Sequence, residues 1–222
     1  MNQRRIPAVL SIAGSDSDGG AGIQADLKAF ARCGVHGMTA ITAITAQNTV
    51  GVTAIEAVSP RMIVEQVRAV AEDIGVDAVK IGMLGTAATV EAVVEALGLV
   101  GEAPVVLDPV MVSESGAALL DDEARAALVE RLLPLTTVVT PNIPEARVLS
   151  GLGDGASQED LARAVLALGP RVAVVTGGHG AALVDREAGE GRADAACMRF
   201  NRTAAYSSSR SSTRGIRPRA TV

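Results

Sequence analysis

Carboxylate and amide side chains follow two apolar runs of the sequence, at the points where strands are expected to end. Asp108 follows the run 104–107, and both Asn142 and Glu145 follow the run 137–140. Mg²⁺ prefers oxygen ligands, and one or two carboxylates suffice when nucleotide phosphates and water complete its coordination. We therefore interpret Asp108 and Glu145 as candidate Mg²⁺ ligands beside the amide of Asn142. A second interpretation makes Asn142 a helix N-cap and Glu145 the third residue of a capping box, and both can hold at once.

A glycine-rich segment, residues 14–22, separates the apolar run 6–13 from a helical pattern. It lacks the Gly-Lys-Ser/Thr ending of a P-loop and the glycine spacing of a dinucleotide-binding turn. Tight turns also need glycine for backbone reasons alone, so the segment by itself is a weak indication of function. Asp26 lies one turn into the following helix, where we expect it near the mouth of the site, and it could bind a hydroxyl or amino group of a neutral ligand. Alternatively, it complements the positive end of the helix dipole.

The segment Gln47-Asn48-Thr49 follows another apolar run, residues 36–46. Amides are costly to bury without partners, so these side chains are expected to find a polar group or solvent. The amide of Gln47 offers a donor and an acceptor together, which matches the edge of an aminopyrimidine. The same residues could simply begin a polar loop.

One histidine and two cysteines are candidate reactive groups. His179 lies in a glycine-rich loop, where a histidine is more commonly a hydrogen-bond or stacking contact than a general base. Cys33 and Cys197 form no Cys-x-x-Cys motif and no plausible disulfide framework. Cys33 is expected in the core near the end of a helix.

The elements that must position these residues alternate along the chain. Apolar runs predict strands at 6–13, 36–46, 78–81, 104–107, 137–140 and 172–176. Helical spacing predicts helices at 23–33, 59–74, 86–97, 121–133, 143–150 and 158–168. Such alternation indicates an α/β fold with a mostly parallel central sheet and helices on both faces. Ligands bind such sheets beyond the carboxyl ends of the strands, where every polar or glycine-rich motif of this chain falls.

Composition favours a single domain that binds a small molecule. The chain has 222 residues, of which 48% are hydrophobic, enough to bury a sizeable core. Aromatic residues make up only 1% and the formal net charge is −5, which argues against a nucleic-acid partner. No long apolar region follows the basic start 1–5, so we expect neither a signal peptide nor a membrane span, and a cytoplasmic location.

Six motifs in chain order carry a resemblance to a known family. They are Ala13-Gly14-Ser15-Asp16 with the run from Gly19 to Lys28, Ala46-Gln47-Asn48-Thr49, Lys80-Ile81-Gly82-Met83-Leu84, Leu107-Asp108-Pro109-Val110-Met111, Thr140-Pro141-Asn142-Ile143-Pro144-Glu145 and Thr176-Gly177-Gly178-His179. Over about residues 6 to 190 they resemble the hydroxymethylpyrimidine/phosphomethylpyrimidine kinases of the ribokinase superfamily. The run 19–28 is much more specific to this family than any other motif.

The resemblance implies a ribokinase-like three-layer sandwich and a reaction of thiamine synthesis. ATP- and Mg²⁺-dependent transfer would phosphorylate 4-amino-5-hydroxymethyl-2-methylpyrimidine and then its monophosphate. By this analogy the pyrimidine pocket is lined by Gly14, Asp26, Gln47, Met83 and Val110. Mg²⁺ is bound by Asp108 and Glu145, and the nucleotide and phosphate side comprises Asn142, Thr176 and Gly178. Members of the family commonly form homodimers. The alternative enzyme is a pyridoxal kinase of the same superfamily, although the Gln47 segment favours the pyrimidine.

The C-terminal residues depart from the family's pattern. We divide the chain into a kinase domain, residues 1–194, and a tail, residues 195–222, with six Arg and five Ser but no Asp, Glu or Lys. Members of the family continue to a Gly-Thr/Ser-Gly-Cys loop whose backbone amides bind the transferring phosphoryl group. Cys197 lies in Ala-Cys-Met-Arg, so we assign no catalytic residue. We expect the domain to be incomplete at this end and the tail to be disordered or frameshifted. The alternative function is then an inactive, pyrimidine-binding remnant.

Overall fold

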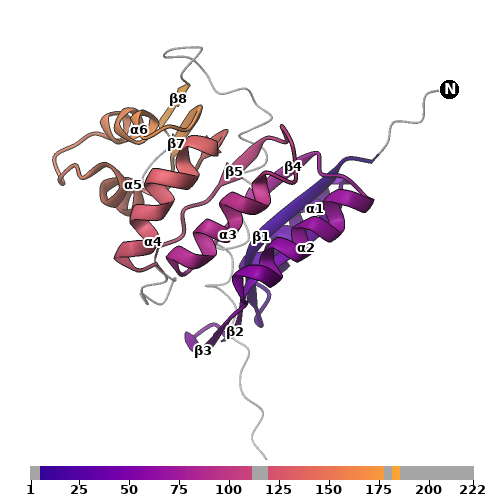
Figure 1. Ribbon diagram of the computed structural model, residues 1–222. Coiled ribbons are helices and arrows are strands. Elements are labelled where there is room, and N and C mark those ends of the chain that lie inside the picture. Colours follow the sequence, from indigo (N-terminus) through magenta and orange to yellow (C-terminus); the bar gives the residue numbers. More distant parts are fainter. Residues whose placement is uncertain (1–5, 112–119, 178–181, 186–222) are drawn as a thin grey trace, which may run out of the picture.

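The computed structural model describes residues 6–111, 120–177 and 182–185, which form an eight-stranded sheet with helices packed against it (Figure 1). The strand order is β3-β2-β1-β4-β5-β6-β7-β8, parallel from β2 to β7 and antiparallel where β3 and β8 join the edges. The strands are β1 (Ala8–Asp16), β2 (His36–Gln47), β3 (Val52–Ala57), β4 (Ala78–Ile81), β5 (Val105–Leu107), β6 (Val138–Val139), β7 (Val172–Val175) and β8 (Ala182–Asp185). The α-helices are α1 (Gly22–Cys33), α2 (Pro60–Asp73), α3 (Ala87–Leu97), α4 (Asp122–Ala127), α5 (Ile143–Ser150) and α6 (Gln158–Ala167). The predicted α/β class with a mostly parallel sheet is confirmed.

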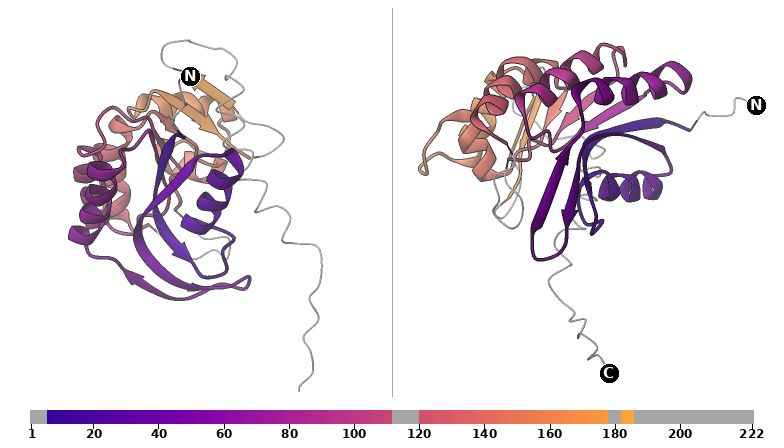
Figure 2. Two further views of the ribbon diagram at one scale, coloured as in Figure 1. Left: turned by 90° about the vertical axis from the view of Figure 1, so that its right-hand side faces the viewer. Right: turned by 60° about the horizontal axis from the view of Figure 1, so that its bottom comes forward.

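Helices cover both faces of the sheet, as the alternation of elements predicted. Helix α1 packs against β1 and β2 on one face, while α2 and α3 lie side by side on the opposite face (Figure 2). Successive side chains of β1 point alternately toward these two helical layers. Leu10 and Ile12 enter the core under α2 and α3, whereas Ser11 between them bonds to a side chain of α1. The face that carries α1 is therefore the one on which polar groups meet.

The core between the sheet and the α2–α3 layer explains why these runs form strands. Leu10, Ile12, Val79, Ile81 and Leu107 are all at most 1% exposed. Burial of each aliphatic side chain contributes about 1.5–3 kcal/mol, more than the roughly 0.5–1 kcal/mol of side-chain entropy lost in ordering it. The strand ends are thus held on a rigid base.

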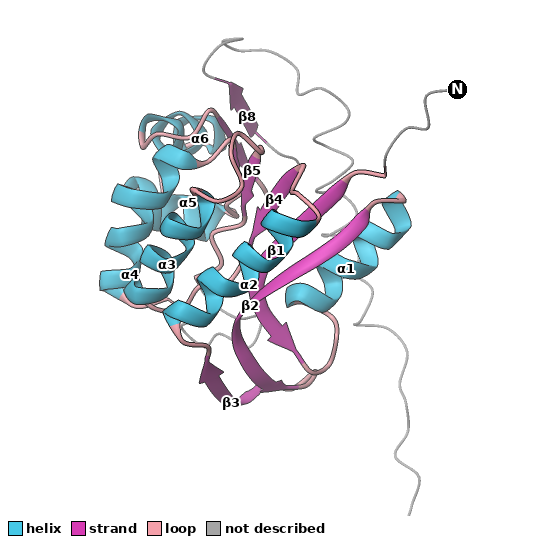
Figure 3. Cartoon of the chain, turned by 45° about the vertical axis from the view of Figure 1, so that its right-hand side comes forward, coloured by secondary structure: helices cyan, strands magenta, loops and turns pink. Residues whose placement is uncertain are grey.

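Two strands were missed and one helix is shorter than predicted. Strand β3 forms an exposed edge beside β2 (Figure 3), so no buried face imposes an apolar alternation on its sequence. Strand β8 is another short edge strand. The helix predicted over 121–133 keeps α-helical geometry only to Ala127 and continues as a π-helical turn, Leu128–Leu132, and a 3₁₀ turn, Leu133–Leu135. Pro134 lies in the last turn, and because it lacks an N–H it cannot continue an α-helical ladder.

The position predicted for Cys33 was wrong. Helix α1 buries Phe30, one turn earlier, but Cys33 is exposed at the last residue of the helix. Gly34 follows in the left-handed conformation, with φ of 71°, and ends the helix at the surface. The apolar stripe of α1 stops before its C-terminus.

Candidate active site

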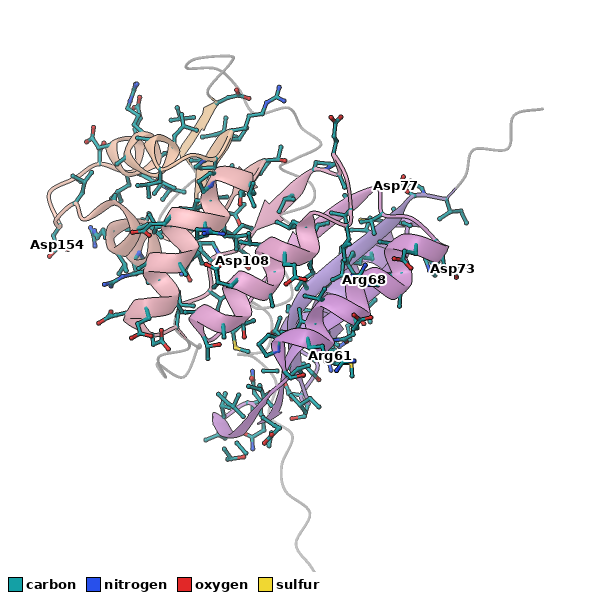
Figure 4. The ribbon with its side chains drawn as sticks, in the orientation of Figure 1. Arg61, Arg68, Asp73, Asp77, Asp108 and Asp154 are labelled. Carbon is teal, nitrogen blue, oxygen red and sulfur yellow. The ribbon has the colours of Figure 1, made fainter. Side chains whose placement is uncertain are left out.

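The structure brings the ends of the parallel strands, and the polar residues that follow them, to one edge of the sheet. Backbone hydrogen bonds extend the ladder past the strands: the Asp108 N–H donates to Ile81 O at 2.9 Å, and the Gly82 N–H donates to Ile12 O at 2.9 Å. At the neighbouring position the Thr176 N–H donates to Pro141 O at 2.8 Å. Figure 4 places Asp108 near the middle of the molecule. The predicted convergence of these motifs on one sheet edge agrees with this geometry.

Asp16 organises the glycine-rich segment, a role that the sequence analysis missed. Its buried carboxylate accepts the backbone N–H groups of Asp18 at 2.9 Å and Ala21 at 2.8 Å. Its carbonyl accepts the Gly19 N–H at 3.1 Å, and Lys28 Nζ donates to Gly19 O at 2.6 Å. An aspartate that bonds to the backbone two residues later is a common turn-forming arrangement, and this was the available signal.

Two glycines in this segment are required by close backbone approaches. Gly22 has φ of +56°, and a Cβ there would lie 2.3 Å from Gly14 O. A Cβ on Gly14 would lie 2.5 Å from Met83 Cε, so the structure puts these two predicted pocket residues in contact. The Met83 backbone is held in turn by Thr42, whose Oγ1 donates to Met83 O at 2.8 Å.

The carboxylate of Asp26 is more deeply buried than its predicted position near the mouth of the site suggested. Its side chain is 8% exposed and lies between α1 and the sheet. Oδ2 accepts a hydrogen bond from Ser11 Oγ at 2.6 Å and pairs with Lys80 Nζ at 3.1 Å. Among the residues that the structure describes, none donates a hydrogen bond to the other oxygen, Oδ1. One oxygen is thus fixed by the protein and the other remains available to a ligand.

Gln47 is held by its backbone at the end of β2. Ser17 Oγ accepts the Gln47 N–H at 2.8 Å and donates to Gln47 O at 2.5 Å, which ties the glycine-rich segment to β2. In the side chain, Oε1 accepts a long bond of 3.4 Å from Thr45 Oγ1. The half-buried amide therefore keeps hydrogen-bonding capacity beside the loop.

The carboxylate of Asp108 lies close enough to Glu145 for its charge to act on that residue. Burial raises the pKa of Asp108, the positive charge of Lys80 lowers it in part, and the charge of Asp26 raises it. Burial is also the main cause that raises the pKa of Glu145 from 4.5 to about 7; the Asn142 N–H lowers it, the charge of Asp108 raises it, and the Met111 N–H lowers it. The positive groups of the chain therefore only partly offset the cost of burying negative charge on these two carboxylates.

Asn142 and Glu145 form the capping box that was the second interpretation of these residues. The Asn142 N–H donates to Glu145 Oε2 at 2.8 Å, and the Glu145 N–H donates to Asn142 Oδ1 at 2.8 Å. The amide oxygen of Asn142 is thereby engaged in the first turn of α5. Glu145 is 8% exposed. Its carboxylate accepts the cap hydrogen bond and also experiences the negative charge of Asp108.

The remaining predicted residues are placed in part. Val110 is half-buried in the turn after Asp108, where its N–H donates to Asp108 O at 2.8 Å. Thr176 pairs with Asn142 in a parallel bridge at the end of β7. Gly178, together with His179, Cys197 and the tail 195–222, lies outside the described residues.

The donor set fits Mg²⁺ only with help from a ligand. Among the residues the structure describes, no group of three or more His, Cys, Asp or Glu side chains could hold a metal ion by itself. Asp108 and Glu145 nevertheless supply two carboxylates whose burial the positive charge of Lys80 offsets only in part. Mg²⁺ commonly binds one or two carboxylates and takes phosphate and water oxygens as its other ligands. The pair fits such an ion.

A groove on the opposite face of the sheet contains none of these residues and does not change this assignment. Its volume is about 630 Å³, and it runs between α2 and α3 with Arg61 and Arg68 on its α2 side (Figure 4). Arg68 pairs with Glu65 at 3.6 Å and also with Glu72 at 3.5 Å. The groove contains none of the strand-end residues, and its charges are largely balanced by one another.

Glu145→Gln is expected to stabilise the protein at alkaline pH. Because the folded pKa of about 7 exceeds the ordinary 4.5, the unfolded chain releases this proton first and stability falls as pH rises between those values. The neutral amide keeps the capping box but avoids the buried charge. Without Mg²⁺, the variant should be about 3 kcal/mol more stable than the parent above pH 7. Urea unfolding across this pH range measures the difference, which should vanish below about pH 4; a pH-independent difference would contradict the assignment.

Comparisons with known proteins show which family this chain is similar to. A family profile described as phosphomethylpyrimidine kinase matches residues 16–214. The chain is 53% identical over 173 residues to a hydroxymethylpyrimidine/phosphomethylpyrimidine kinase of Rhizobium meliloti, which covers 77% of this chain and 65% of the relative. It is 48% identical over 176 residues to the same enzyme of Haemophilus influenzae, covering 78% and 65%. The chain thus spans about 65% of the length of these relatives.

Solved structures agree with this assignment. A crystal structure of phosphomethylpyrimidine kinase from Clostridium difficile matches with a TM-score of 0.76 and 40% identity, covering 91% of both chains. A pyridoxal kinase from Staphylococcus aureus in complex with pyridoxal matches with a TM-score of 0.73 and 34% identity, covering 82% of this chain and 69% of that one. Within the described ranges, no helix has both the length and the apolar character to cross a membrane.

Proposed function

The chain belongs to the phosphomethylpyrimidine kinase family, and from this premise we propose that it phosphorylates 4-amino-5-hydroxymethyl-2-methylpyrimidine, and then the monophosphate, at the expense of ATP. The observation that carries the proposal is the state of Asp26. A carboxylate that is nearly buried, with one oxygen fixed and the other free, is suited to accept a hydrogen bond from an amino group. The 4-amino group of this pyrimidine is such a donor.

On the pyrimidine side, Asp26 and Gln47 supply the polar contacts and smaller groups shape the pocket. The contact between Gly14 and Met83 offers a side-chain-free backbone next to a flexible thioether, which suits the face of a planar ring. Val110 adds an apolar wall beside Asp108. These residues orient the ring so that its hydroxymethyl group is directed toward the phosphate side.

On the phosphate side, Asp108 and Glu145 would hold Mg²⁺. When bound, Mg²⁺ neutralises charge on the nucleotide phosphates. Asn142, Thr176 and Gly178 are proposed to lie along the nucleotide, with the oxygen of the Asn142 amide already engaged in the cap of α5. Orientation of the two substrates is the main contribution of these residues, since phosphoryl transfer depends on positioning and electrostatics.

Turnover by these 222 residues is proposed to be slow. The sequence contains no Gly-Thr/Ser-Gly-Cys motif, and a set of backbone donors for the transferring group is worth about 10²–10³ in rate per donor. We attribute the difference to a shifted reading frame near residues 192–200, as the composition of the tail 195–222 suggests. Resequencing the gene downstream of residue 190 tests this: the motif in another frame supports it, and its absence there refutes it.

Pyridoxal is the second candidate substrate. The pyridoxal kinase of Staphylococcus aureus shares the fold at 34% identity, so the scaffold alone does not separate the two vitamins. Pyridoxal carries an aldehyde, next to its hydroxymethyl group, where the pyrimidine carries an amino group. A carboxylate such as that of Asp26 accepts a hydrogen bond from the amino group, whereas the aldehyde has no hydrogen to donate.

The function is tested by incubating the chain with ATP, Mg²⁺ and either substrate, and by measuring the phosphorylated products by mass spectrometry. We expect the pyrimidine monophosphate and diphosphate to form slowly, and pyridoxal phosphate to form at least tenfold more slowly still. A preference for pyridoxal would refute the proposed substrate. Turnover as fast as that of an intact relative would refute the proposal that this form is impaired.

A further inference from the structure

Lys80 is a nearly buried lysine that the assignment of site residues leaves without a role. It lies in β4 on the face that carries α1, whereas its neighbours Val79 and Ile81 enter the core of the opposite face. Its side chain is 14% exposed. Lysine is rarely buried unless it is paired, because desolvation of an ammonium group is costly. Its position therefore needs an explanation in terms of the charges around it.

The ammonium group of Lys80 is directed along β4 toward the edge with the strand ends. Nζ lies 3.0 Å from the place that a Cβ on Gly82 would occupy, two residues further along the same face. Gly82 thus leaves the space through which the ammonium reaches Asp26 Oδ2, at 3.1 Å. Ser11 Oγ binds the same oxygen from β1 at 2.6 Å. Two donors on one oxygen fix the rotation of the carboxylate.

The same ammonium also faces the phosphate side of the site. Lys80 pairs with Val106 across the parallel β4–β5 ladder, so Asp108 lies two residues further on, level with Gly82 and on the same face. The positive charge of Lys80 lowers the pKa of Asp108, in line with this proximity. Lys80 is therefore located between the carboxylate of the pyrimidine side and that of the Mg²⁺ side.

We propose that Lys80 is a positioning residue that links the two halves of the site: it holds Asp26 Oδ2 so that Oδ1 remains directed to the pyrimidine, and its charge moderates the attraction of Asp108 and Glu145 for a divalent cation. The inference rests on the proposed function for its first half. When the ammonium is removed, the first half of the proposal predicts weaker binding of the pyrimidine and the second half predicts tighter binding of a divalent cation. A purely structural lysine predicts the same direction for both.

Lys80→Met tests this with two binding measurements that need no turnover. Affinity for the hydroxymethylpyrimidine, measured by calorimetry, is expected to fall at least tenfold because Asp26 loses a donor that orients it. Affinity for Mn²⁺, measured by electron paramagnetic resonance without nucleotide, is expected to rise several-fold because a competing positive charge has been removed. Ser11→Ala is the matched control. It removes the other donor to the same oxygen without a change of charge, so it should weaken pyrimidine binding and leave Mn²⁺ binding unchanged.

Lys80→Arg provides a second variant if Lys80→Met does not fold. It keeps the charge, but the larger guanidinium cannot occupy the space beside Gly82, so we expect parental Mn²⁺ affinity and weaker pyrimidine binding. Loss of both affinities in a folded Lys80→Met, or no change in either, would overturn the proposal. If the parent chain itself binds no pyrimidine, the proposed substrate is wrong, while the Mn²⁺ measurement still decides whether Lys80 moderates the carboxylate pair.

Discussion

Gly22→Ala is expected to destabilise the protein by about 3 kcal/mol or more and to abolish binding of the pyrimidine. A methyl group at this position would lie 2.3 Å from Gly14 O, and the φ of +56° disfavours any side chain. Because the clashing atom belongs to the backbone of β1, it cannot move aside without displacing the segment that links β1 to α1. Gly14 and its contact with Met83 would shift with it.

Gly34→Ala separates the clash from the backbone conformation. Gly34 has φ of +71°, but a Cβ there would meet nothing within 4 Å. Its replacement should cost about 1 kcal/mol and leave pyrimidine binding intact. Urea unfolding and calorimetry of both variants measure these effects. Equal losses in the two variants would show that the approach of Gly22 to Gly14 does not hold the turn together.

Asp26→Asn is expected to weaken pyrimidine binding about 10- to 100-fold, the second large effect. A hydrogen bond to a charged acceptor contributes about 1.5–3 kcal/mol, and each 1.4 kcal/mol is a factor of ten in affinity. The amide would also leave Lys80 without its ion pair, so a loss of stability is expected as well. Nucleotide binding should change far less, because the nucleotide is assigned to the other end of the site.

Asp18→Asn is the matched control, because it makes the same change of charge in the same part of the chain. Asp18 is exposed in the glycine-rich segment. Its replacement should change the dissociation constant of the pyrimidine less than twofold, as measured by calorimetry. Pyrimidine affinity that survives in folded Asp26→Asn would show that Asp26 does not contact the ligand.

The sequence alone could predict which residues follow strands, because strand ends are marked locally. Asp108 follows three apolar residues, and Asn142 with Glu145 has the spacing of a capping box, which the structure contains. The parallel topology then brings such ends to one edge. These predictions required only neighbouring residues and a general rule of α/β sheets.

The partners of Asp26 could not be predicted in this way. Ser11 and Lys80 each lie inside an apolar strand, and they meet Asp26 only because β1 pairs with β4 and α1 packs against β1. The register that puts Ser11 opposite Lys80 is a property of the folded sheet. The burial of Asp26 could not be predicted for the same reason, because the helix residue is covered by strands that lie elsewhere in the sequence.

The exposed edge strand β3 was missed for a different reason. Five of its six residues are exposed, so burial does not constrain their polarity and the apolar alternation is absent. Helix α4 shows the converse, since its apolar pattern continues through residues that the structure places in π and 3₁₀ turns. The periodicity of apolar residues shows which side chains are buried. It therefore locates a helix correctly only where the buried residues also have α-helical geometry.

A crystal structure of the chain with bound hydroxymethylpyrimidine is the most direct test of the central claim, that one sheet edge holds the pyrimidine. The account predicts that the ring lies against Gly14 and Met83, with its amino group in hydrogen-bond distance of Asp26 Oδ1. A pyrimidine bound elsewhere, such as in the groove between α2 and α3, would contradict it.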